Sequence, residues 1–323
     1  MLDTDETQNV DNTAAFVNES LPNEENKSSM KKKLMTWLTA AAIGCTVLAG
    51  SVMSVAAEEE AAEEESEIPY DVQTIEIGNG TEVGYYESGM NNDQTVIFIH
   101  GFTMSKDVWV PMMQRFENDY HVIAIDMVGH GDTKMSESEY LNEYAFADEL
   151  RGVMEAFGED RYIAVGHSLG GCFIEQYICK YGTENLAAVA MMDSTPSFNV
   201  LDDWTYTANG EFGGRKWVEE NEELWRSFTT DEDGMETALT ACQTDNREAF
   251  SKIDIPAYYF YPEHDEATMA DQAGMIAWIE EVSDPEYLTV IAIDSDVHGF
   301  PFQSPSDEET MGYLAELFEK AAV

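Results

Sequence analysis

The chain has 323 residues, of which 44% are hydrophobic, and 64 acidic residues against 16 basic ones give a net charge of −48. This length and apolar content are sufficient for one large or two ordinary domains, each with its own core. The charge excludes nucleic acid and anionic lipid surfaces as natural partners, because both would be repelled.

The first 57 residues are typical of an export signal. Residues 1–29 are polar and acidic without periodic apolar positions, which indicates disorder, and Met30 is an alternative start of translation. Residues 30–57 combine Lys31, Lys32 and Lys33 with an apolar run from Leu34 to Ala57, the layout of a secretory signal peptide. Cleavage after Ala57 would make Glu58 the first mature residue, and the domain would be secreted.

Two alternatives remain for this segment. The 24 residues Leu34–Ala57 are long enough to stay in a bilayer as an anchor, with the lysines in the cytoplasm and the domain outside. The residues before Cys45 loosely resemble a lipoprotein box, although the apolar run continues past this cysteine. All three interpretations place the domain outside the cytoplasm, at the cell surface or beyond it. Residues 58–69, rich in Glu and Ala, are then a solvated spacer.

Cysteine usage indicates neither a disulfide framework nor a metal site. Only Cys172, Cys179 and Cys242 follow the signal, an odd number in a large domain, so we expect buried free thiols. One bridge remains possible if Cys242 reaches either of the others. No Cys/His spacing fits zinc and no glycine-rich loop fits a phosphate, so we expect no metal and no cofactor.

Residues 70–323 alternate strands with helices. A hairpin is predicted around Gly78 and Gly80, from Val72–Ile77 and Glu82–Glu87. Runs that are apolar on both faces predict buried parallel strands between helices. The strands are Thr95–Ile99, His121–Ile125, Tyr162–Val165, Leu186–Met192, Ala257–Tyr261 and Leu288–Ile293, and the helices are Leu141–Phe157, Gly171–Tyr181, Asp271–Val282 and Ser306–Lys320. The pattern predicts an α/β fold with a mostly parallel eight-stranded sheet.

One interval interrupts this alternation. Phe198–Ile253 contains no strong strand and several aromatic residues, and we interpret it as a mostly helical cap inserted over the site. Trp204, Trp217 and Trp225 are its candidates for contact with substrate. The simpler alternative is that these rings only anchor the cap to its base.

The most informative motif follows the strand Tyr162–Val165. Gly166-His167-Ser168-Leu169-Gly170 places a serine on a tight turn between a strand and a helix, and this turn leaves no room for a Cβ at either glycine. A serine needs a base to become a nucleophile, and a histidine needs a carboxylate to fix its tautomer. His298, after the strand Leu288–Ile293, is the predicted base. Asp265, after Ala257–Tyr261, is the predicted acid, with Asp193 as the alternative.

The order Ser168, Asp265, His298, each residue after a strand, resembles the α/β-hydrolase fold superfamily. His100-Gly101-Phe102 and the segment from Asp126 to Thr133 resemble two further motifs of this superfamily. The resemblance implies an oxyanion hole made by the backbone N–H groups of Phe102 and Leu169. It also implies contact of Phe102 and of His167 with substrate, and purely structural roles for His100 and for Asp126.

These features predict a serine hydrolase that cleaves a small or medium carboxylic ester through an acyl-enzyme on Ser168. A lactonase or a proline-iminopeptidase-like aminopeptidase on the same triad is the alternative, with Glu219, Glu220, Glu222 and Glu223 as a possible acidic cluster. A serine at position 168 argues against relatives that need a carboxylate nucleophile. A binding module without catalysis is a third possibility, but it would be expected to have lost a triad residue.

Overall fold

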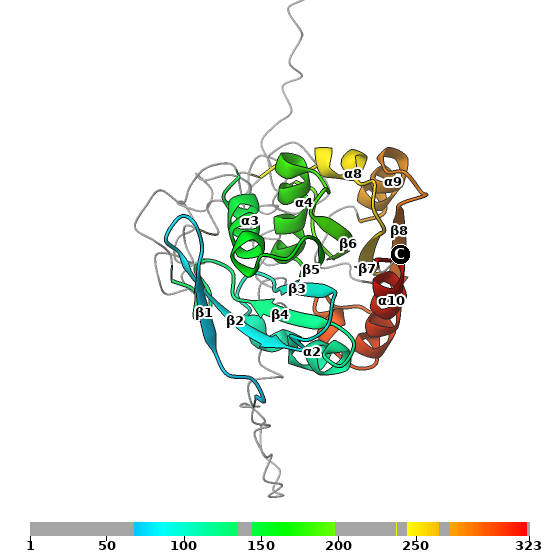
Figure 1. The fold of residues 1–323 in the computed structure, drawn as a ribbon. Helices are drawn as coiled ribbons and strands as arrows, with labels where there is room; N and C mark the ends of the chain where they lie inside the picture. Colours follow the sequence, from blue (N-terminus) through cyan, green and yellow to red (C-terminus); the bar gives the residue numbers. More distant parts are fainter. Residues whose placement is uncertain (1–67, 135–143, 198–236, 238–243, 265–271, 322–323) are drawn as a thin grey trace, which may run out of the picture.

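The computed structural model describes residues 68–134, 144–197, 237, 244–264 and 272–321. Over these residues the chain forms one eight-stranded sheet with helices on both faces (Figure 1). The strand order is β1-β2-β4-β3-β5-β6-β7-β8. From β4 to β8 neighbouring strands are parallel, whereas β1 and β2 pair with their neighbours in the antiparallel sense. The predicted mostly parallel sheet is confirmed.

Every strand that the apolar runs predicted is present, with ends that differ by at most two residues. The strands are β1 (Gln73–Glu76), β2 (Glu82–Ser88), β3 (Thr95–Ile99), β4 (His121–Ile125), β5 (Tyr162–His167), β6 (Leu186–Met192), β7 (Ala257–Pro262) and β8 (Leu288–Ile293). The central strands β3, β4, β5 and β6 are buried along their whole length, since helices cover them on both sides.

The helices are less completely anticipated by the sequence. They are η1 (Lys106–Trp109), α2 (Val110–Phe116), α3 (Ala145–Phe157), α4 (Leu169–Tyr181), α8 (Glu248–Lys252), α9 (Gln272–Val282), η2 (Phe300–Phe302) and α10 (Ser306–Ala321). The four predicted helices correspond to α3, α4, α9 and α10. The sequence did not reveal α2, because it is only seven residues long and carries Pro111 in its first turn, where proline is tolerated.

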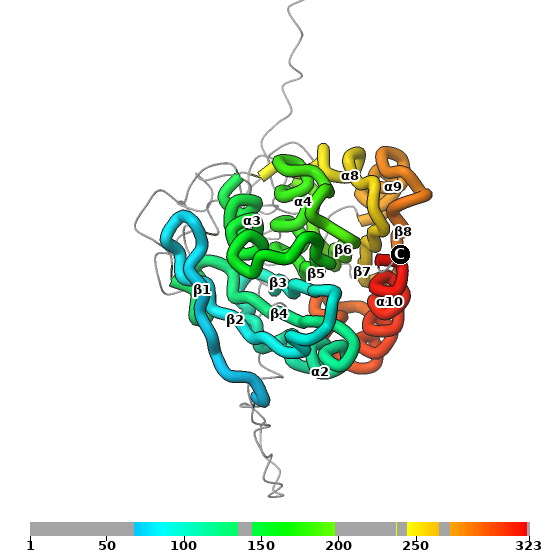
Figure 2. The backbone as a smooth tube through the Cα atoms, in the orientation of Figure 1, coloured from blue at the N-terminus to red at the C-terminus, as the bar shows by residue number. Residues whose placement is uncertain are grey.

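The two faces of the sheet have separate apolar cores. On one face α3, α4, α8 and α9 pack on the sheet, and the ring of Phe146 stacks on that of Phe173 with centroids 4.4 Å apart. On the other face α2 and α10 pack together, with Phe116 and Phe318 in ring contact at 4.8 Å. The tube in Figure 2 shows these helices on opposite sides of the strands.

The last residues of the interval predicted to form a cap pack in the main core instead. Helix α8 lies within the interval 198–253, but Ala249 and Phe250 are fully buried in the main core. The ring of Phe250 contacts those of Tyr259 and Trp278. The end of this interval therefore belongs to the main core of the sheet domain. Residues 198–236 and 238–243, with the three tryptophans, lie outside the described residues.

Three further expectations concern residues that the structure describes only in part. Residues 1–67, with the export signal and most of the spacer, lie outside the described residues. In the part of the chain that is described, no helix is long and apolar enough to cross a membrane. Cys172 and Cys179 are free thiols, as expected. Cys242 lies outside the described residues.

Glycines allow α4 to approach the strands that precede it. A Cβ placed on Gly170 would lie 2.2 Å from the carbonyl oxygen of Ile99, at the end of β3. A Cβ on Gly166 would lie 2.3 Å from the carbonyl oxygen of Gly170. Both distances are far below van der Waals contact with backbone atoms that cannot move freely. The motif therefore needs glycine at both positions for the helix to start where it does.

We predict that Gly170→Ala lowers the free energy of unfolding by about 3 kcal/mol or more, because the new methyl group overlaps the backbone of β3. Gly312→Ala is the matched control. Gly312 is an exposed position inside α10 with nothing within 4 Å of the added Cβ, so this change should stabilise the protein by roughly 0.5–1 kcal/mol. Urea unfolding of both variants measures the difference. Equal stabilities would contradict the packing argument.

Candidate active site

Ser168 occupies the sharp turn between β5 and α4. Its backbone has φ 53° and ψ −118°, a conformation that costs a non-glycine residue about 1–3 kcal/mol. Its N–H donates to the carbonyl oxygen of Met192 at 2.8 Å, which ties the turn to the end of β6. The side chain is neither buried nor fully exposed. The turn therefore presents the hydroxyl at the carboxyl end of the sheet, beside the first turn of a helix.

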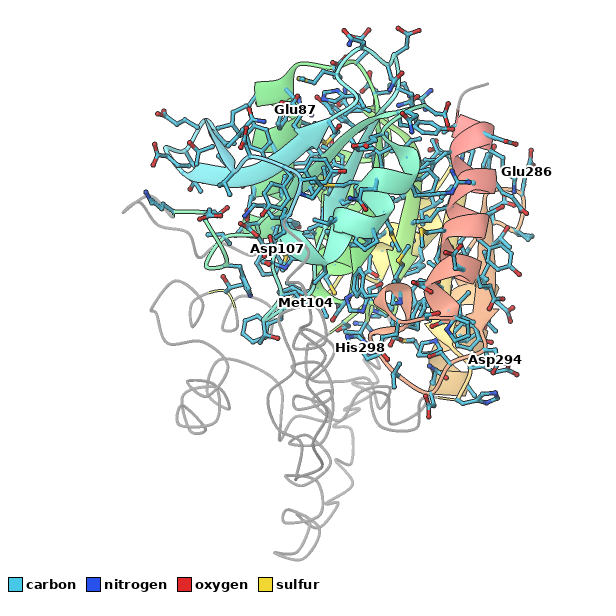
Figure 3. All side chains as sticks on the ribbon, turned by 90° about the horizontal axis from the view of Figure 1, so that it is seen from below. Glu87, Met104, Asp107, Glu286, Asp294 and His298 are labelled. Atoms are coloured by element: carbon cyan, nitrogen blue, oxygen red, sulfur yellow. The ribbon has the colours of Figure 1, made fainter. Side chains whose placement is uncertain are left out.

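A buried histidine–carboxylate pair lies at the same end of the sheet. Nδ1 of His298 donates to Oδ2 of Asp193 at 2.6 Å, and the two side chains are 3% and 0% exposed. Because Nδ1 is the donor, the Nε2 atom of neutral His298 is left as a base. Figure 3 shows His298 and Met104 at one end of the domain, whereas Glu87 lies at the other.

The parallel register explains how these residues meet. His167 pairs with Met192 at the ends of β5 and β6, so Ser168 and Asp193 follow directly on neighbouring strands. Asp193 has φ 47°, also in the left-handed region, and its N–H donates to the carbonyl oxygen of Phe260 at 2.8 Å. The carboxyl ends of parallel strands share one edge, and the turns that follow them build the site there.

The carboxylate on His298 corrects the sequence prediction. Asp265 was expected to hold His298, with Asp193 as the alternative, and the structure places Asp193 on Nδ1. The reason is that β6 is the immediate neighbour of β5, so its exit turn lies nearer to Ser168 than that of β7. Asp265 lies outside the described residues. The preceding His264 is exposed beside Glu263 and Asp294, as expected of a solvated loop residue.

His167 is not a substrate contact, which corrects a second expectation. Its side chain is fully buried, and Nε2 donates to the backbone carbonyl of His298 at 2.9 Å. Its ring lies 4.7 Å from that of His298 and edge-on to Phe302. Burial and the nearby His298 hold the pKa of His167 well below its usual value, so the ring is neutral. It supports the backbone of His298 from behind.

The loop after β3 lies against Ser168. A Cβ on Gly101 would lie 3.1 Å from Cβ of Ser168 and 3.0 Å from Nδ1 of His167. The next residue, Phe102, is half-buried with its ring edge-on to His130 at 5.3 Å. The loop that carries Phe102 therefore runs beside Ser168, the residue before Leu169. Phe102 and Leu169 are the two residues predicted to form an oxyanion hole. Leu169 is the first residue of α4, so its N–H has no acceptor within the helix.

His130 fixes this loop, a role that the sequence did not indicate. Its Nε2 accepts the N–H of Thr103 at 3.0 Å, and its Nδ1 donates to the carbonyl oxygen of Val128 at 3.0 Å. Thr103 has φ 68°, a strained value for a β-branched residue. The hydrogen bond from its N–H to His130 holds that conformation. Nothing in the sequence pointed to His130 except its place between two glycines of a turn.

His100 braces the same loop, in agreement with the structural role that we expected. Nδ1 donates to the carbonyl oxygen of Gly101 at 2.7 Å, and Nε2 accepts the N–H of Met127 at 3.1 Å. The side chain is fully buried, and burial followed by the nearby His130 holds its pKa well below the usual value. A neutral ring satisfies both hydrogen bonds with one tautomer. His100 therefore joins the ends of β3 and β4.

Below the loop lies a buried ionic cluster that the sequence also did not reveal. Nζ of Lys106 lies 2.7 Å from Asp126 and 2.6 Å from Asp132, and the lysine side chain is only 3% exposed. Asp126 also accepts the N–H groups of Lys106 and Asp132. Burial lowers the pKa of Lys106, but the hydrogen bonds and charges of both aspartates outweigh it and leave the pKa raised. Asp126 is structural, as predicted.

Comparison with known proteins agrees with the fold. A sequence profile described as the alpha/beta hydrolase fold matches residues 94–228, from β3 past the site serine. The chain is 28% identical over 124 residues to the bifunctional esterase/perhydrolase DCH of Acinetobacter calcoaceticus, which is 38% of this chain and 44% of that enzyme. It is 24% identical over 229 residues to the non-heme chloroperoxidase CPO-A1 of Kitasatospora aureofaciens, covering 61% of this chain and 82% of the relative.

A solved structure extends the similarity to the whole domain. The esterase RhEst1 from Rhodococcus sp. ECU1013 superimposes with a TM-score of 0.58 at 19% identity, covering 76% of this chain and 99% of that one. The sequence match to the Acinetobacter enzyme covers less than half of that enzyme's length. Outside the matched residues, the similarity to known proteins is one of fold. The described part of the chain has the α/β-hydrolase fold.

We predict that Lys106→Met lowers the free energy of unfolding by roughly 3–5 kcal/mol, because Asp126 is left buried without its cation. The control is Lys180→Met, which removes the partly exposed ion pair with Asp148 and should cost less than about 1 kcal/mol. The double variant with Asp126→Asn should recover part of the loss, since the two changes are coupled. Urea unfolding measures all three. Equal losses for both lysines would contradict the prediction.

Proposed function

We propose that this protein is a serine hydrolase that cleaves a carboxylic ester of small or medium size. The observation that carries the proposal is the hydrogen bond of 2.6 Å from Nδ1 of His298 to Asp193, at the sheet end where Ser168 sits on a strained turn. A histidine with a fixed tautomer and a strained, partly exposed serine are the parts that acyl transfer needs. In this proposal Asp193 takes the role that the sequence assigned to Asp265.

The proposed reaction uses protein groups alone. Nε2 of His298 removes the proton of the Ser168 hydroxyl as Oγ attacks the ester carbonyl, and Asp193 stabilises the imidazolium that forms. The tetrahedral intermediate collapses when the same imidazolium gives its proton to the leaving alcohol. Water, activated by His298, then hydrolyses the acyl-enzyme and restores Ser168. The acyl group leaves as a carboxylic acid.

The backbone N–H groups of Phe102 and Leu169 are the proposed oxyanion hole. One belongs to the loop after β3 and the other to the first residue of α4, and Gly101 lets the two backbones approach. Donors of this kind each contribute about 10²–10³ in rate when they are held rigidly. The hydrogen bonds of His130 and His100 supply that rigidity, because they fix both sides of the loop.

Two of the similar proteins favour ester substrates. The Acinetobacter relative is an esterase as well as a perhydrolase, and RhEst1 is an esterase. Specificity within this superfamily depends on the residues that cover the site rather than on the triad. The aminopeptidase and lactonase alternatives use the same triad, so substrate tests must separate them.

The decisive test is turnover of p-nitrophenyl acetate, butyrate and octanoate by the wild type and three variants. Ser168→Ala should abolish turnover, and Asp193→Asn should lower kcat/KM by at least about 10³-fold because the wrong histidine tautomer is stabilised. Asp265→Asn is the matched control and should stay within about threefold of the wild type. If Asp265→Asn lowered kcat/KM more than Asp193→Asn, the assignment of Asp193 would be overturned.

Two further readouts separate the alternatives. Labelling of Ser168 by a fluorophosphonate without turnover of any p-nitrophenyl ester would favour an amidase, lactonase or peptidase. Hydrolysis of a prolyl arylamide would identify the aminopeptidase. An unlabelled Ser168 in the folded protein would contradict a serine hydrolase and favour a binding module.

We also propose that the domain is exported by its N-terminal segment. The support is the order of three lysines, an apolar run and small residues in 30–57. Expression of the full chain in a bacterial host, followed by mass spectrometry of the secreted fraction, should give a mature protein that starts at Glu58. Recovery of the intact chain in membranes would favour the anchor, and recovery in the cytosol would overturn export.

A further inference from the structure

Glu175 is a buried carboxyl group behind the site that the proposed reaction does not use. It lies on α4, seven residues after Ser168, and is fully buried. Its Oε1 accepts the hydroxyl proton of Ser194 at 2.6 Å. Ser194 is the residue directly after Asp193. A glutamate at a fully buried helical position is unusual unless its polar atoms have partners, so its contacts require an explanation.

The contact with Ser194 is possible only because α4 has a glycine there. A Cβ on Gly171 would lie 2.6 Å from Cβ and 2.9 Å from Oγ of Ser194. The turn after β6 therefore packs directly on the backbone of the helix that follows Ser168. Glu175 reaches the serine one helical turn further along the same helix.

Further hydrogen bonds hold the Asp193 turn, defined as Asp193–Ser197. The hydroxyl of Tyr259, on β7, donates to the carbonyl oxygen of Ser194, and Sγ of Cys172 donates to that of Thr195 at 3.4 Å. The N–H of Asn246 donates to the carbonyl oxygen of Pro196 at 2.7 Å. Glu175 and Tyr259 both contact Ser194, the residue next to Asp193, but only Glu175 contacts its side chain among these groups.

This support matters because Asp193 has an unfavourable backbone conformation. A positive φ costs a non-glycine residue on the order of 1 kcal/mol or more and persists only where the surroundings enforce it. If the turn relaxed, the carboxylate would rotate away from Nδ1 of His298. A displacement of about 1 Å in such an arrangement lowers rates by as much as ~10²-fold.

We propose that Glu175 is a positioning residue, which through the hydroxyl of Ser194 holds the turn that places Asp193 on His298, and that it does so in its neutral form. This inference rests on the proposed function, since it assigns the support of that function's catalytic acid. Glu175 itself touches neither the substrate nor the reacting atoms in this proposal.

The surroundings of Glu175 favour the neutral carboxyl group. Burial raises its pKa to about 8, although hydrogen bonds with Ser194 and Asn246 act in the opposite direction. The titratable groups that interact with it, Cys172, Cys179 and Tyr259, all have raised pKa values because of burial. On α8, Lys252 and Glu248 lie beside Cys179, and on α3 the buried Glu149 accepts the N–H of Val128.

Ionisation of Glu175 should therefore loosen the Asp193 turn. Any rearrangement that admits water stabilises a buried negative charge. The segment that is hydrogen-bonded to the carboxyl group, and so would rearrange, is this turn. At pH 9, one unit above its pKa, only about one tenth of the molecules keep the neutral form. If the neutral form is the active one, kcat at pH 9 should be about tenfold below that at pH 7.

The test compares kcat and KM for p-nitrophenyl acetate from pH 6 to pH 9. Glu175→Gln keeps an amide oxygen for the Ser194 hydroxyl but cannot ionise, so its kcat should match the wild type within about threefold at pH 7 and lack the alkaline decrease. Ser194→Ala should lower kcat by about 10–100-fold with little change in KM. Glu149→Gln is the matched control, because it replaces another fully buried glutamate and should keep the wild-type alkaline decrease.

Thermal unfolding gives a second readout on the same proteins. In the folded protein the pKa of Glu175 is raised from its ordinary value of 4.5 to about 8. The proton on Glu175 therefore contributes its full stabilisation below pH 4.5, and this contribution is lost as the pH rises from 4.5 to about 8. The Tm of the wild type should decrease over this interval, and the decrease should be smaller in Glu175→Gln. A pH-dependent Tm alone would indicate a structural role for Glu175. The change in kcat identifies Glu175 as a positioning residue.

The role of Glu175 can be tested even if the proposed esterase activity is wrong. If the wild type hydrolyses no ester, the rate of fluorophosphonate labelling of Ser168 over the same pH range replaces kcat, because labelling needs only a serine activated by His298. An alkaline decrease that persists unchanged in Glu175→Gln would overturn the proposal. So would a Ser194→Ala variant with wild-type kcat.

Discussion

The hydrogen bond between Asp193 and Nδ1 of His298 is the interaction on which the site depends. It fixes which nitrogen of the ring is free, and it requires a carboxylate in a turn with an unfavourable backbone conformation. Ser168 has a positive φ as well, so two strained residues face each other across the ends of β5 and β6. Strain of this kind persists where packing leaves no alternative.

The packing that enforces it is supplied by groups outside the proposed triad. His167 holds the backbone of His298, His130 holds the loop of Phe102, and the neighbouring Lys106 neutralises Asp126 beneath that loop. All three are buried: His130 makes hydrogen bonds on two sides, Lys106 pairs with charged carboxylates, and His167 donates to one backbone carbonyl. The chemistry lies in a few atoms, but the precision of their placement comes from this polar layer between the sheet and the site.

The sequence predicted the sheet well because its strands are buried on both faces and appear as uninterrupted apolar runs, Leu186–Met192 being the clearest. Ser168 and His298 were predictable since each stands in a motif after such a run. Asp193 was only an alternative, because two strands in succession are each followed by an aspartate and the sequence does not say which exit turn lies beside His298. His130, Lys106 and Glu175 gave no signal, since their roles come from long-range contacts that no spacing encodes.

The absence of a side chain at Gly171 has a consequence for the evolution of the site. Gly171 and Ser194 are in contact through space, so each restricts what the other position can tolerate. A lineage that acquired alanine at 171 would need a smaller residue at 194 or a shifted turn, and would then lose the partner of Glu175. The three positions 171, 175 and 194 should therefore change together among relatives, as one inherited unit.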